Sequence, residues 1–326
     1  MEGKILLRNI INKKCMVTRL IITLVLSIFT IIGVNNKMNK NFVIKQEVLT
    51  YKKLPSGFNN YKILQLSDLH SKEFGENNKN LLDAVEKINP DLILVTGDMF
   101  TVSDISIDMN VENLIPYQLL SQLAPNYKII YVSGNHEEGK DIIYNGDDYA
   151  SRDRSKNNAY NRYRYKLESL GVTFVENSST NIASKTKANT NNNMNNNNSS
   201  KLTNNENFIS IYGVYYESMK KDEYYQSITL DKTKFNIMLC HDPKYFDTFA
   251  NIGFDLVLSG HVHGGIIRLP LIGGLLSPDR TFFPKYDKGI YKINSSYMNV
   301  SAGLGDSIIK RTFNPPEINV LLLKNE

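Results

Sequence analysis

Residues 61–70 read YKILQLSDLH, a short apolar stretch that ends in an aspartate and a histidine. The run Tyr61–Ser67 has the length and apolar content of a strand, and Asn77–Ile88 after it carries apolar residues at helical spacing. Asp91–Thr96 (DLILVT) then predicts a second strand. A strand, a helix and a second strand in this order are typical of an α/β fold.

The alternation continues along the rest of the chain. Pro116 suits the first turn of a helix that ends near Leu123, and another helix is predicted over about 158–170. Further strands are predicted at Lys128–Ser133, Val172–Val175, Phe208–Val214, Phe235–Cys240, Asp255–Ser259, Gly289–Ile293, Met298–Ser301 and Ile318–Leu323. Helix-separated strands followed by closely spaced strands predict an α/β architecture with more than one sheet.

Composition and charge exclude several classes of protein. With 41% hydrophobic and 22% charged residues among 326, the chain is neither wholly disordered nor a polytopic membrane protein. The net charge of +5 is local: residues 1–40 carry seven Lys/Arg and one Glu, so residues 41–326 carry a net −1. We therefore expect no nucleic-acid partner.

Cys15 and Cys240 are not in a C-x-x-C pair, so neither is expected to ligate a metal.

Residues 20–34 read LIITLVLSIFTIIGV, an uncharged stretch preceded by five Lys/Arg. With residues 16–19 it approaches the length needed to cross a bilayer. A cleaved signal peptide and a buried core helix are the alternatives, but no small-x-small cleavage site follows. We predict a basic cytoplasmic segment and a signal-anchor at about 16–34, together forming residues 1–40. A short linker and one folded domain (41–326) then lie outside the cell membrane, anchored by this single pass.

An asparagine-rich tract interrupts the pattern. Residues 189–198 contain eight asparagines within a longer polar stretch. Such a segment buries too little apolar surface to offset its ordering entropy. We predict a disordered loop at about 178–206. An interaction segment is the alternative, and no feature of the tract supports it.

All five histidines lie at or just beyond the end of a predicted strand, beside Asp, Asn or Gly. The strings are SDLH (67–70), TGD (96–98), SGNHE (133–137), CHDP (240–243) and SGHVHGG (259–265). Ligands of open α/β sheets bind outside the carboxyl ends of the strands, so these strings can converge in space.

Each string also has a structural explanation of its own. Gly97-Asp98 is a common turn, and Asp242-Pro243 suits a helix N-cap followed by the first helical residue. His261 and His263 carry a stronger signal, because alternate residues of a strand face the same side. Taken together, imidazole, carboxylate and amide oxygen without thiolate suit Mn, Fe, Co or Zn. Seven candidate ligands exceed one tetrahedral site and suit two adjacent ions that share a carboxylate.

The order D-x-H, G-D, G-N-H-[ED], a lone His and G-H-x-H resembles the calcineurin-like metallophosphoesterases, over residues 63–265. Later strings resemble the membrane-anchored bacterial phosphodiesterase branch of that family: GGIIRLPLIGG (264–274), KYDKGIY (285–291), SAGLGDSIIKR (301–311) and PPEINVLLL (315–323). The resemblance covers roughly residues 58–323. It implies a four-layer α/β/β/α sandwich with the site where the two sheets meet.

The resemblance also implies a dinuclear centre with two divalent ions, Mn, Fe or Zn. One ion would be bound by Asp68, His70, Asp98 and His263, and the other by Asp98, Asn135, His241 and His261, with Asp98 as the bridge. His136 is left as the catalytic residue, either as the proton donor to the leaving group or as a cation that binds a phosphate oxygen. The implied reaction is hydrolysis of a phosphodiester by a hydroxide that bridges the two metals.

Several alternatives remain open from the sequence. The chain could be a phosphomonoesterase, a hydrolase of another bond, or a non-catalytic binding module on the same fold. A lipid or cell-envelope substrate fits a membrane-anchored enzyme. The apolar residues of Ile266–Phe283 are explained either by loop packing or by contact with an acyl chain or membrane.

Overall fold

The computed structural model describes residues 2–104, 110–138, 154–184, 208–269, 271–306 and 310–326. The chain divides into two units, residues 1–41 and 42–326. In the first unit, α1 (Glu2–Lys40) is one continuous helix, which joins the predicted basic segment and signal-anchor. Its part Lys13–Lys40 is long and apolar enough to cross a bilayer, judged by length and composition. This helix is the candidate membrane span of the described chain.

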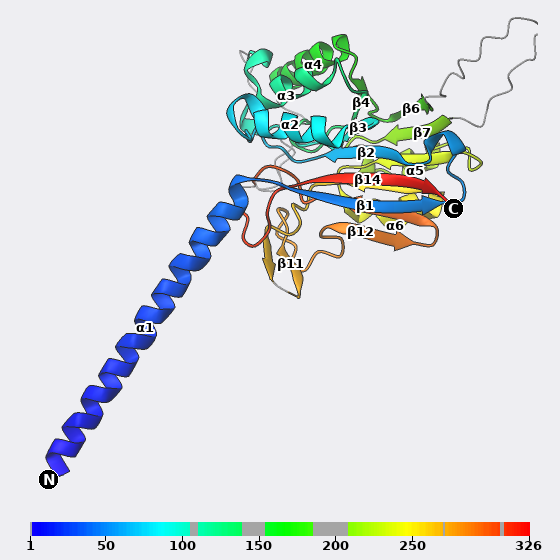
Figure 1. Ribbon diagram of the computed structural model, residues 1–326. Coiled ribbons are helices and arrows are strands. Elements are labelled where there is room, and N and C mark those ends of the chain that lie inside the picture. Colours follow the sequence, from blue (N-terminus) through cyan, green and yellow to red (C-terminus); the bar gives the residue numbers. More distant parts are fainter. Residues whose placement is uncertain (1, 105–109, 139–153, 185–207, 270, 307–309) are drawn as a thin grey trace, which may run out of the picture. The chain divides into compact units, whose positions relative to one another are not determined.

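In its described residues, the second unit contains two six-stranded sheets (Figure 1). The first sheet has the order β1 (Val43–Tyr51), β14 (Glu317–Asn325), β2 (Tyr61–Leu66), β3 (Leu92–Val95), β4 (Ile129–Tyr131) and β5 (Thr173–Phe174). Strands β2 to β5 run parallel to one another. Strand β14 is antiparallel to β2 and parallel to β1. The start of β1 therefore lies at the end of the sheet where β2 finishes.

The second sheet repeats the mainly parallel pattern. Its order is β12 (Gly289–Ile293), β13 (Ser296–Val300), β9 (Leu256–Ser259), β8 (Phe235–Leu239), β7 (Phe208–Gly213) and β6 (Ser178–Ala183). Strands β13, β9, β8 and β7 are parallel, and the two edge strands are antiparallel to their neighbours. A separate antiparallel pair consists of β10 (Ile267–Leu269) and β11 (Gly273–Leu276).

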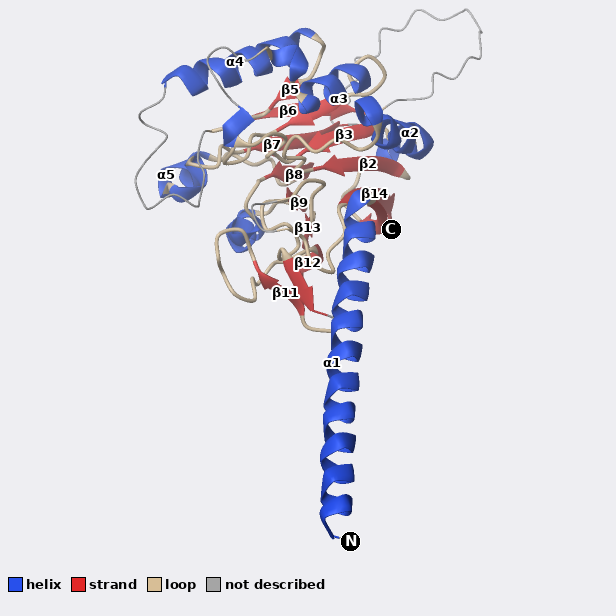
Figure 2. Ribbon diagram, turned by 90° about the vertical axis from the view of Figure 1, so that its left-hand side faces the viewer, coloured by secondary structure: helices blue, strands red, loops and turns tan. Residues whose placement is uncertain are grey.

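Three buried apolar layers hold the second unit together, and they define a four-layer sandwich. Alternation along β2 shows the arrangement: Leu64 packs in a cluster with Leu81 and Leu120, while Ile63 packs in a different one with Ile237 of the second sheet. A third cluster joins the outer face of the second sheet to its helices. The predicted α/β/β/α architecture is confirmed (Figure 2).

The helices of the two outer layers are short. The helices that cover the first sheet are α2 (Lys79–Ile88), α3 (Ile115–Leu123) and α4 (Arg154–Ser169). The helices that pack against the second sheet are α5 (Asp222–Ser227) and α6 (Phe246–Ile252). Pro116 lies in the first turn of α3, as predicted. Short 3-10 helices include η3 (Val102–Asp104) and η7 (Pro243–Tyr245).

Four strands were not expected, namely β1, β6 and the pair β10 and β11. Strand β1 occupies the segment predicted as a linker, and β6 occupies the first residues of the predicted loop at about 178–206. Both are edge strands whose residues are mostly exposed or half-buried, so they lack the apolar run of a central strand. Residues 185–207, with the asparagine tract, lie outside the described residues.

Candidate metal centre

The candidate ligands meet at the carboxyl ends of five strands. Asp68 and His70 follow β2, Asp98 follows β3, and Asn135 follows β4 in the first sheet. His241 follows β8, and His261 and His263 follow β9 in the second sheet. All seven side chains are buried; His70 is intermediate as a whole residue, but only 4% of its side chain is accessible. The predicted convergence at strand ends is confirmed by three overlapping groups of Asp and His side chains.

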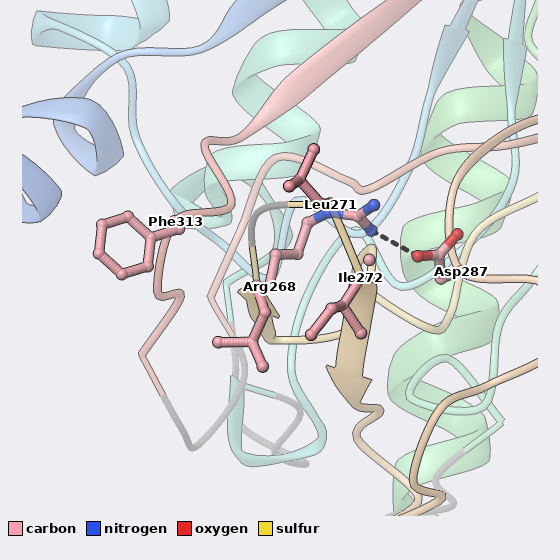
Figure 3. Close-up of a pocket in the computed structure, with 7 residues that line it drawn as sticks. Arg268, Leu271, Ile272, Asp287 and Phe313 are labelled. Atoms are coloured by element: carbon pink, nitrogen blue, oxygen red, sulfur yellow. Dashed lines mark hydrogen bonds and ion pairs between the residues drawn. The ribbon is translucent and has the colours of Figure 1, made fainter.

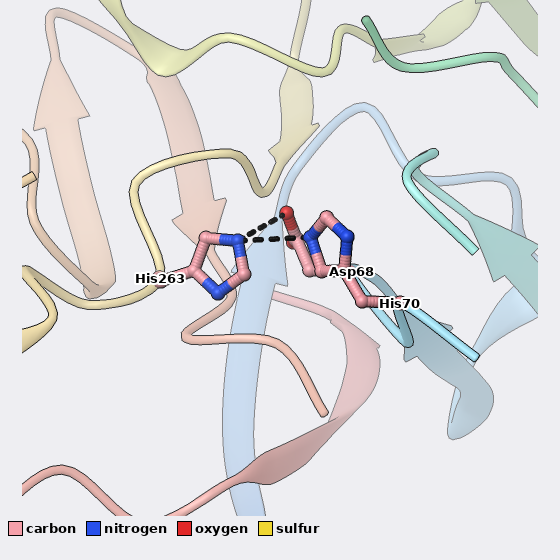
Figure 4. Close-up of side chains that lie close together, drawn as sticks. All are labelled: Asp68, His70 and His263. Atoms are coloured by element: carbon pink, nitrogen blue, oxygen red, sulfur yellow. Dashed lines mark hydrogen bonds and ion pairs between the residues drawn. The ribbon is translucent and has the colours of Figure 1, made fainter. Parts of the chain in front are cut away.

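The first group contains Asp68, His70 and His263 (Figure 4). Its potential ligand atoms all lie within 4.8 Å of one another. The Nε2 atoms of the two histidines are 3.0 Å apart, and Nε2 of His263 is 3.5 Å from Oδ1 of Asp68. These three atoms face a common point and could hold one cation.

Asp98 connects this group to a second one, which contains Asp98, His241 and His261. Its Oδ2 lies 3.0 Å from Nε2 of His241 and 3.9 Å from Nε2 of both His70 and His136. The Asp98 carboxylate therefore lies between the two groups. Asn135 precedes His136, whose backbone amide donates to Oδ1 of Asp98 at 2.9 Å.

The loops that carry these residues have an unusual backbone. Five of the seven candidate ligands have φ between 47° and 68°: Asp68, His70, Asp98, His261 and His263. Such left-handed conformations are costly for residues other than glycine and persist where the surrounding structure enforces them. The expectation that His261 and His263 share one face of a strand is wrong. Strand β9 ends at Ser259, and the two rings join different groups.

Two glycines allow the loops to approach one another. A Cβ at Gly260 would lie 2.2 Å from Oδ2 of Asp68, and a Cβ at Gly134 would lie 2.2 Å from Oδ1 of Asp98. Both distances are far below van der Waals contact, so any larger residue would displace a candidate ligand. This explains why the strings G-H-x-H and G-N-H each begin with a glycine.

Hydrogen bonds at Nδ1 distinguish His241 from His136. Nδ1 of His241 lies 2.6 Å from the carbonyl oxygen of Thr96, which can only accept, so Nδ1 carries a proton and Nε2 is the nitrogen that faces Asp98. In His136, Nδ1 accepts from the backbone amide of Val102 at 3.1 Å, so the neutral ring carries its proton on Nε2. His241 is thereby prepared as a ligand, and His136 is prepared as a donor.

His263 is held by two buried residues that sequence reasoning missed. Nη2 of Arg311 lies 3.2 Å from Nδ1 of His263, and Nδ2 of Asn314 donates to the His263 carbonyl. Arg311 can only donate, so without a metal the His263 proton lies on Nε2, facing His70. An ion bound through Nε2 of His263 would require the other tautomer of this ring, with the proton on Nδ1. The local sequence pattern around Arg311 gives no signal that this side chain is buried.

Burial and mutual charge set the protonation of the centre. Burial lowers the pKa of His70 to about 3 and that of His261 to about 4, so both rings are neutral at pH 7. Burial would also lower the pKa of His241, but the Asp98 carboxylate outweighs it and raises this pKa to about 10. Burial raises the pKa of Asp68 to about 6. Although burial opposes it, nearby His241 and His136 hold the pKa of Asp98 well below its usual range.

This donor set fits divalent cations. Imidazoles and two carboxylates converge at distances short enough to share an ion, and no thiol takes part among the described residues. Without a cation, Asp68 and Asp98 would be two carboxylates buried in one network of histidines. A divalent cation compensates that charge.

Glu137 is a third residue that sequence reasoning passed over, after Arg311 and Asn314, although it stands in the string SGNHE. It is buried, and its carboxylate accepts four hydrogen bonds from the loops that follow β3 and β4 and from Tyr131. A glutamate immediately after a candidate catalytic histidine was the available signal. Glu137 positions the loops of the site but belongs to none of the ligand groups.

Comparison with known proteins agrees with this geometry. The family described as Calcineurin-like phosphoesterase matches residues 61–265. The chain is 27% identical to the uncharacterized metallophosphoesterase YkuE of Bacillus subtilis, over 83% of this chain and 82% of that protein. It is 25% identical to the phosphodiesterase YaeI of Escherichia coli, over 81% of this chain and 82% of that protein.

The matched residues include the five strand ends from which every candidate ligand comes. Members of this family are metal-dependent hydrolases of phosphoesters, and the clustered Asp and His side chains suit that chemistry. On both grounds, the chain belongs to the calcineurin-like phosphoesterase family.

Proposed function

We propose that this protein is a dinuclear metal-dependent phosphoesterase that cleaves a phosphodiester. The observation that carries the proposal is the position of Asp98. Its carboxylate belongs to one group with His241 and His261, and it also lies 3.9 Å from Nε2 of His70, a member of the group of Asp68 and His263. A carboxylate shared by two sets of ligands is what a pair of adjacent ions requires.

The residues divide between the two ions as follows. Asp68, His70, Asp98 and His263 would hold one ion, and Asp98, Asn135, His241 and His261 would hold the other. When bound, two divalent ions in such a centre activate a water molecule and neutralise charge on the phosphoryl group. The protein itself contributes mainly positioning, which phosphoryl transfer requires above all. Mn, Fe or Zn all suit this donor set.

His136 supplies the proton for the leaving group in this proposal. The Val102 amide holds the ring in the tautomer with the proton on Nε2, the atom that lies 3.9 Å from Asp98. The ring is also more exposed than the proposed ligands His241 and His263, with 18% of its side chain accessible. A donor that reaches solvent and lies beside the bridging carboxylate can meet an ester oxygen of the substrate.

A cavity beside the second group supports a diester over a monoester. It has a volume of about 260 Å³ and is lined by Asp242 and Val262, the neighbours of His241 and His261. Lys244 and Lys285 also line it. A diester carries a second organic arm that a monoester lacks, and this cavity offers room for one. The relative named phosphodiesterase YaeI supports the same choice.

The apolar helix α1 suggests where the substrate lies. If Lys13–Lys40 crosses the cell membrane with the N-terminus inside, the enzyme works on the outer side, close to lipid. A phosphodiester of a lipid headgroup or of the cell envelope is the substrate class that this location favours. The oligomeric state does not enter the proposal.

The test is turnover by the full chain purified in detergent and loaded with Mn²⁺. We expect bis(4-nitrophenyl) phosphate to be hydrolysed faster than 4-nitrophenyl phosphate, with about two ions bound per chain. Faster cleavage of the monoester would instead identify a phosphomonoesterase. Full metal content without turnover of either ester would identify a binding module.

A further inference from the structure

The hairpin of β10 and β11 exposes apolar side chains where a soluble surface would bury or replace them. Leu271 is fully exposed, and 63% of Ile272 is accessible. Phe313, from the segment that precedes β14, lines a cavity of about 540 Å³ together with these two residues (Figure 3). We call Leu271, Ile272 and Phe313 the apolar tip.

Two more exposed aromatic side chains lie on the segment that pairs with β11. Phe282 and Phe283 are 67% and 59% accessible, and their segment pairs with β11 through the bond from Phe283 N to the Leu275 carbonyl at 3.0 Å. In the described part of residues 42–326, nine large hydrophobic side chains are exposed, and five belong to the apolar tip or to this pair. Such clustering marks a surface that contacts another apolar phase.

The base of the hairpin is tied to neighbouring segments by hydrogen bonds of Arg268. Nη1 of Arg268 donates to the Gly264 carbonyl at 2.5 Å and to Asp287 at 2.7 Å. The backbone of Arg268 also bonds to Thr312, which precedes Phe313, at 2.9 Å. Because Gly264 follows His263, the hairpin is tied directly to a loop of the metal centre.

The chain enters the second unit beside this surface. The amide of Val43, the first residue of β1, donates to the Pro316 carbonyl at 2.8 Å, three residues after Phe313. Glu317 pairs with Val43 and also accepts from the amide of Ala302. Ala302 adjoins Gly303, where a Cβ would lie 2.5 Å from Asp68. The entry point of the chain, the apolar tip and the metal centre therefore share one end of the sandwich.

Few residues link the candidate membrane helix to the first strand of the second unit. Helix α1 ends at Lys40, and three Cα to Cα steps reach Val43. An extended chain covers at most about 3.5 Å per residue, so these steps span roughly 10 Å. If α1 crosses a bilayer, the short link keeps that bilayer within reach of the end of the sandwich that carries the apolar tip. Exposed Arg280 and Lys310 near this surface suit anionic headgroups.

We infer that the apolar tip, with Phe282 and Phe283, inserts into the surface of the bilayer that α1 crosses. Apolar and aromatic side chains beside cationic ones are the usual composition of an interfacial contact. Insertion would hold the metal centre at the headgroup level, where a lipid phosphodiester lies. The inference rests on the proposed membrane anchor and deepens the proposed substrate class.

The protein contains no tryptophan, so a single introduced one reports its own surroundings. The full chain carrying L271W is reconstituted in phosphatidylcholine/phosphatidylglycerol vesicles, with and without brominated lipid. The matched control is Y165W, at an exposed position on α4. We expect blue-shifted emission and strong quenching by brominated lipid for L271W, and red emission without such quenching for Y165W.

Equal emission and equal quenching of both variants would overturn the inference. Failure of the chain to float with the vesicles would overturn it together with the anchor. The readout needs neither metal nor turnover, so it separates this inference from the proposed reaction. Quenching of L271W in a chain that cleaves no phosphodiester would leave the contact intact and reject the proposed activity.

Discussion

The carboxylate of Glu137 accepts a hydrogen bond from the backbone amide of Asp98 at 2.8 Å. The same oxygen accepts from the Gly134 amide at 3.0 Å, and its partner oxygen accepts from the Met99 amide and the Tyr131 hydroxyl. One buried side chain therefore ties the loop after β3 to the loop after β4. Asp98 owes its place between the two ligand groups to this connection.

Replacing Glu137 tests that connection. In Glu137→Gln, one carboxylate oxygen is replaced by an NH₂ group. This group cannot accept the hydrogen bond of the backbone amide that it faces. Leaving a buried donor unsatisfied costs about 1–3 kcal/mol of unfolding free energy. We expect lower stability in chemical denaturation and reduced metal content. Tyr131→Phe is the control, because it removes one donor and leaves the three amide contacts in place. Metal content as high in Glu137→Gln as in Tyr131→Phe would contradict the positioning role.

Asp98 and His136 should separate metal binding from catalysis. Asp98→Ala removes a ligand from both proposed ions, so metal content and turnover should fall together, by at least the roughly 10–100-fold typical of changes around a metal site. His136→Ala should keep both ions and lose about 10²–10⁴-fold in turnover, the usual contribution of a positioned acid. Elemental analysis beside turnover measures both quantities.

The leaving group sharpens the prediction for His136. A nitrophenolate needs little protonation, whereas an alkoxide needs a proton, so His136→Ala should harm an alkyl diester more than a nitrophenyl diester. Loss of metal in His136→Ala would show that this ring is a ligand. Unchanged turnover of both esters would show that it is only part of a turn.

The Val102 amide offers an independent test of the His136 tautomer. Val102→Pro removes the N–H that donates to Nδ1 of His136, and Val102→Ala keeps it. We expect Val102→Pro to lower turnover about 10-fold or more with both ions still bound, since orienting partners of site residues typically contribute on that scale. Equal turnover of the proline and alanine variants would mean that the amide does not set the proton position.

Metal removal should destabilise the folded body. An ion that binds only the folded state adds ~2.7 kcal/mol of unfolding free energy at 100 times its Kd. Thermal unfolding of the chelated protein should therefore occur at a lower Tm than that of the Mn²⁺-loaded protein. The difference should shrink in Asp98→Ala, and an undiminished difference would place the stabilising ion elsewhere.

Membrane topology is open to a direct test. Five Lys/Arg precede residue 20, whereas Lys37 and Lys40 follow the apolar stretch, which predicts a cytoplasmic N-terminus. Protease added to intact spheroplasts should digest the body. Digestion only after lysis would reverse the orientation and move the enzyme to the cytoplasm.

The sequence by itself determined the central strands and the seven candidate ligands. Apolar runs such as Tyr61–Leu66 and Leu92–Val95 are buried on both faces, so they stand out without knowledge of their partners. Parallel strands bring their carboxyl ends to one edge, so polar residues after each run had to meet. Edge strand β1 escaped prediction because its residues are mostly exposed and its register comes from β14.

The residue pattern alone did not divide the candidate ligands between two groups; the family resemblance implied a division, and the tertiary structure gives its geometric reason. His261 and His263 are two residues apart, yet left-handed backbone at both directs their rings to different groups. The protons of His136 and His241 depend on Val102 and Thr96, which come from other loops. The apolar tip lies beside the chain entry because β1 pairs in parallel with β14. Such long-range contacts have no local pattern, since they arise from the packing of segments that lie tens to hundreds of residues apart.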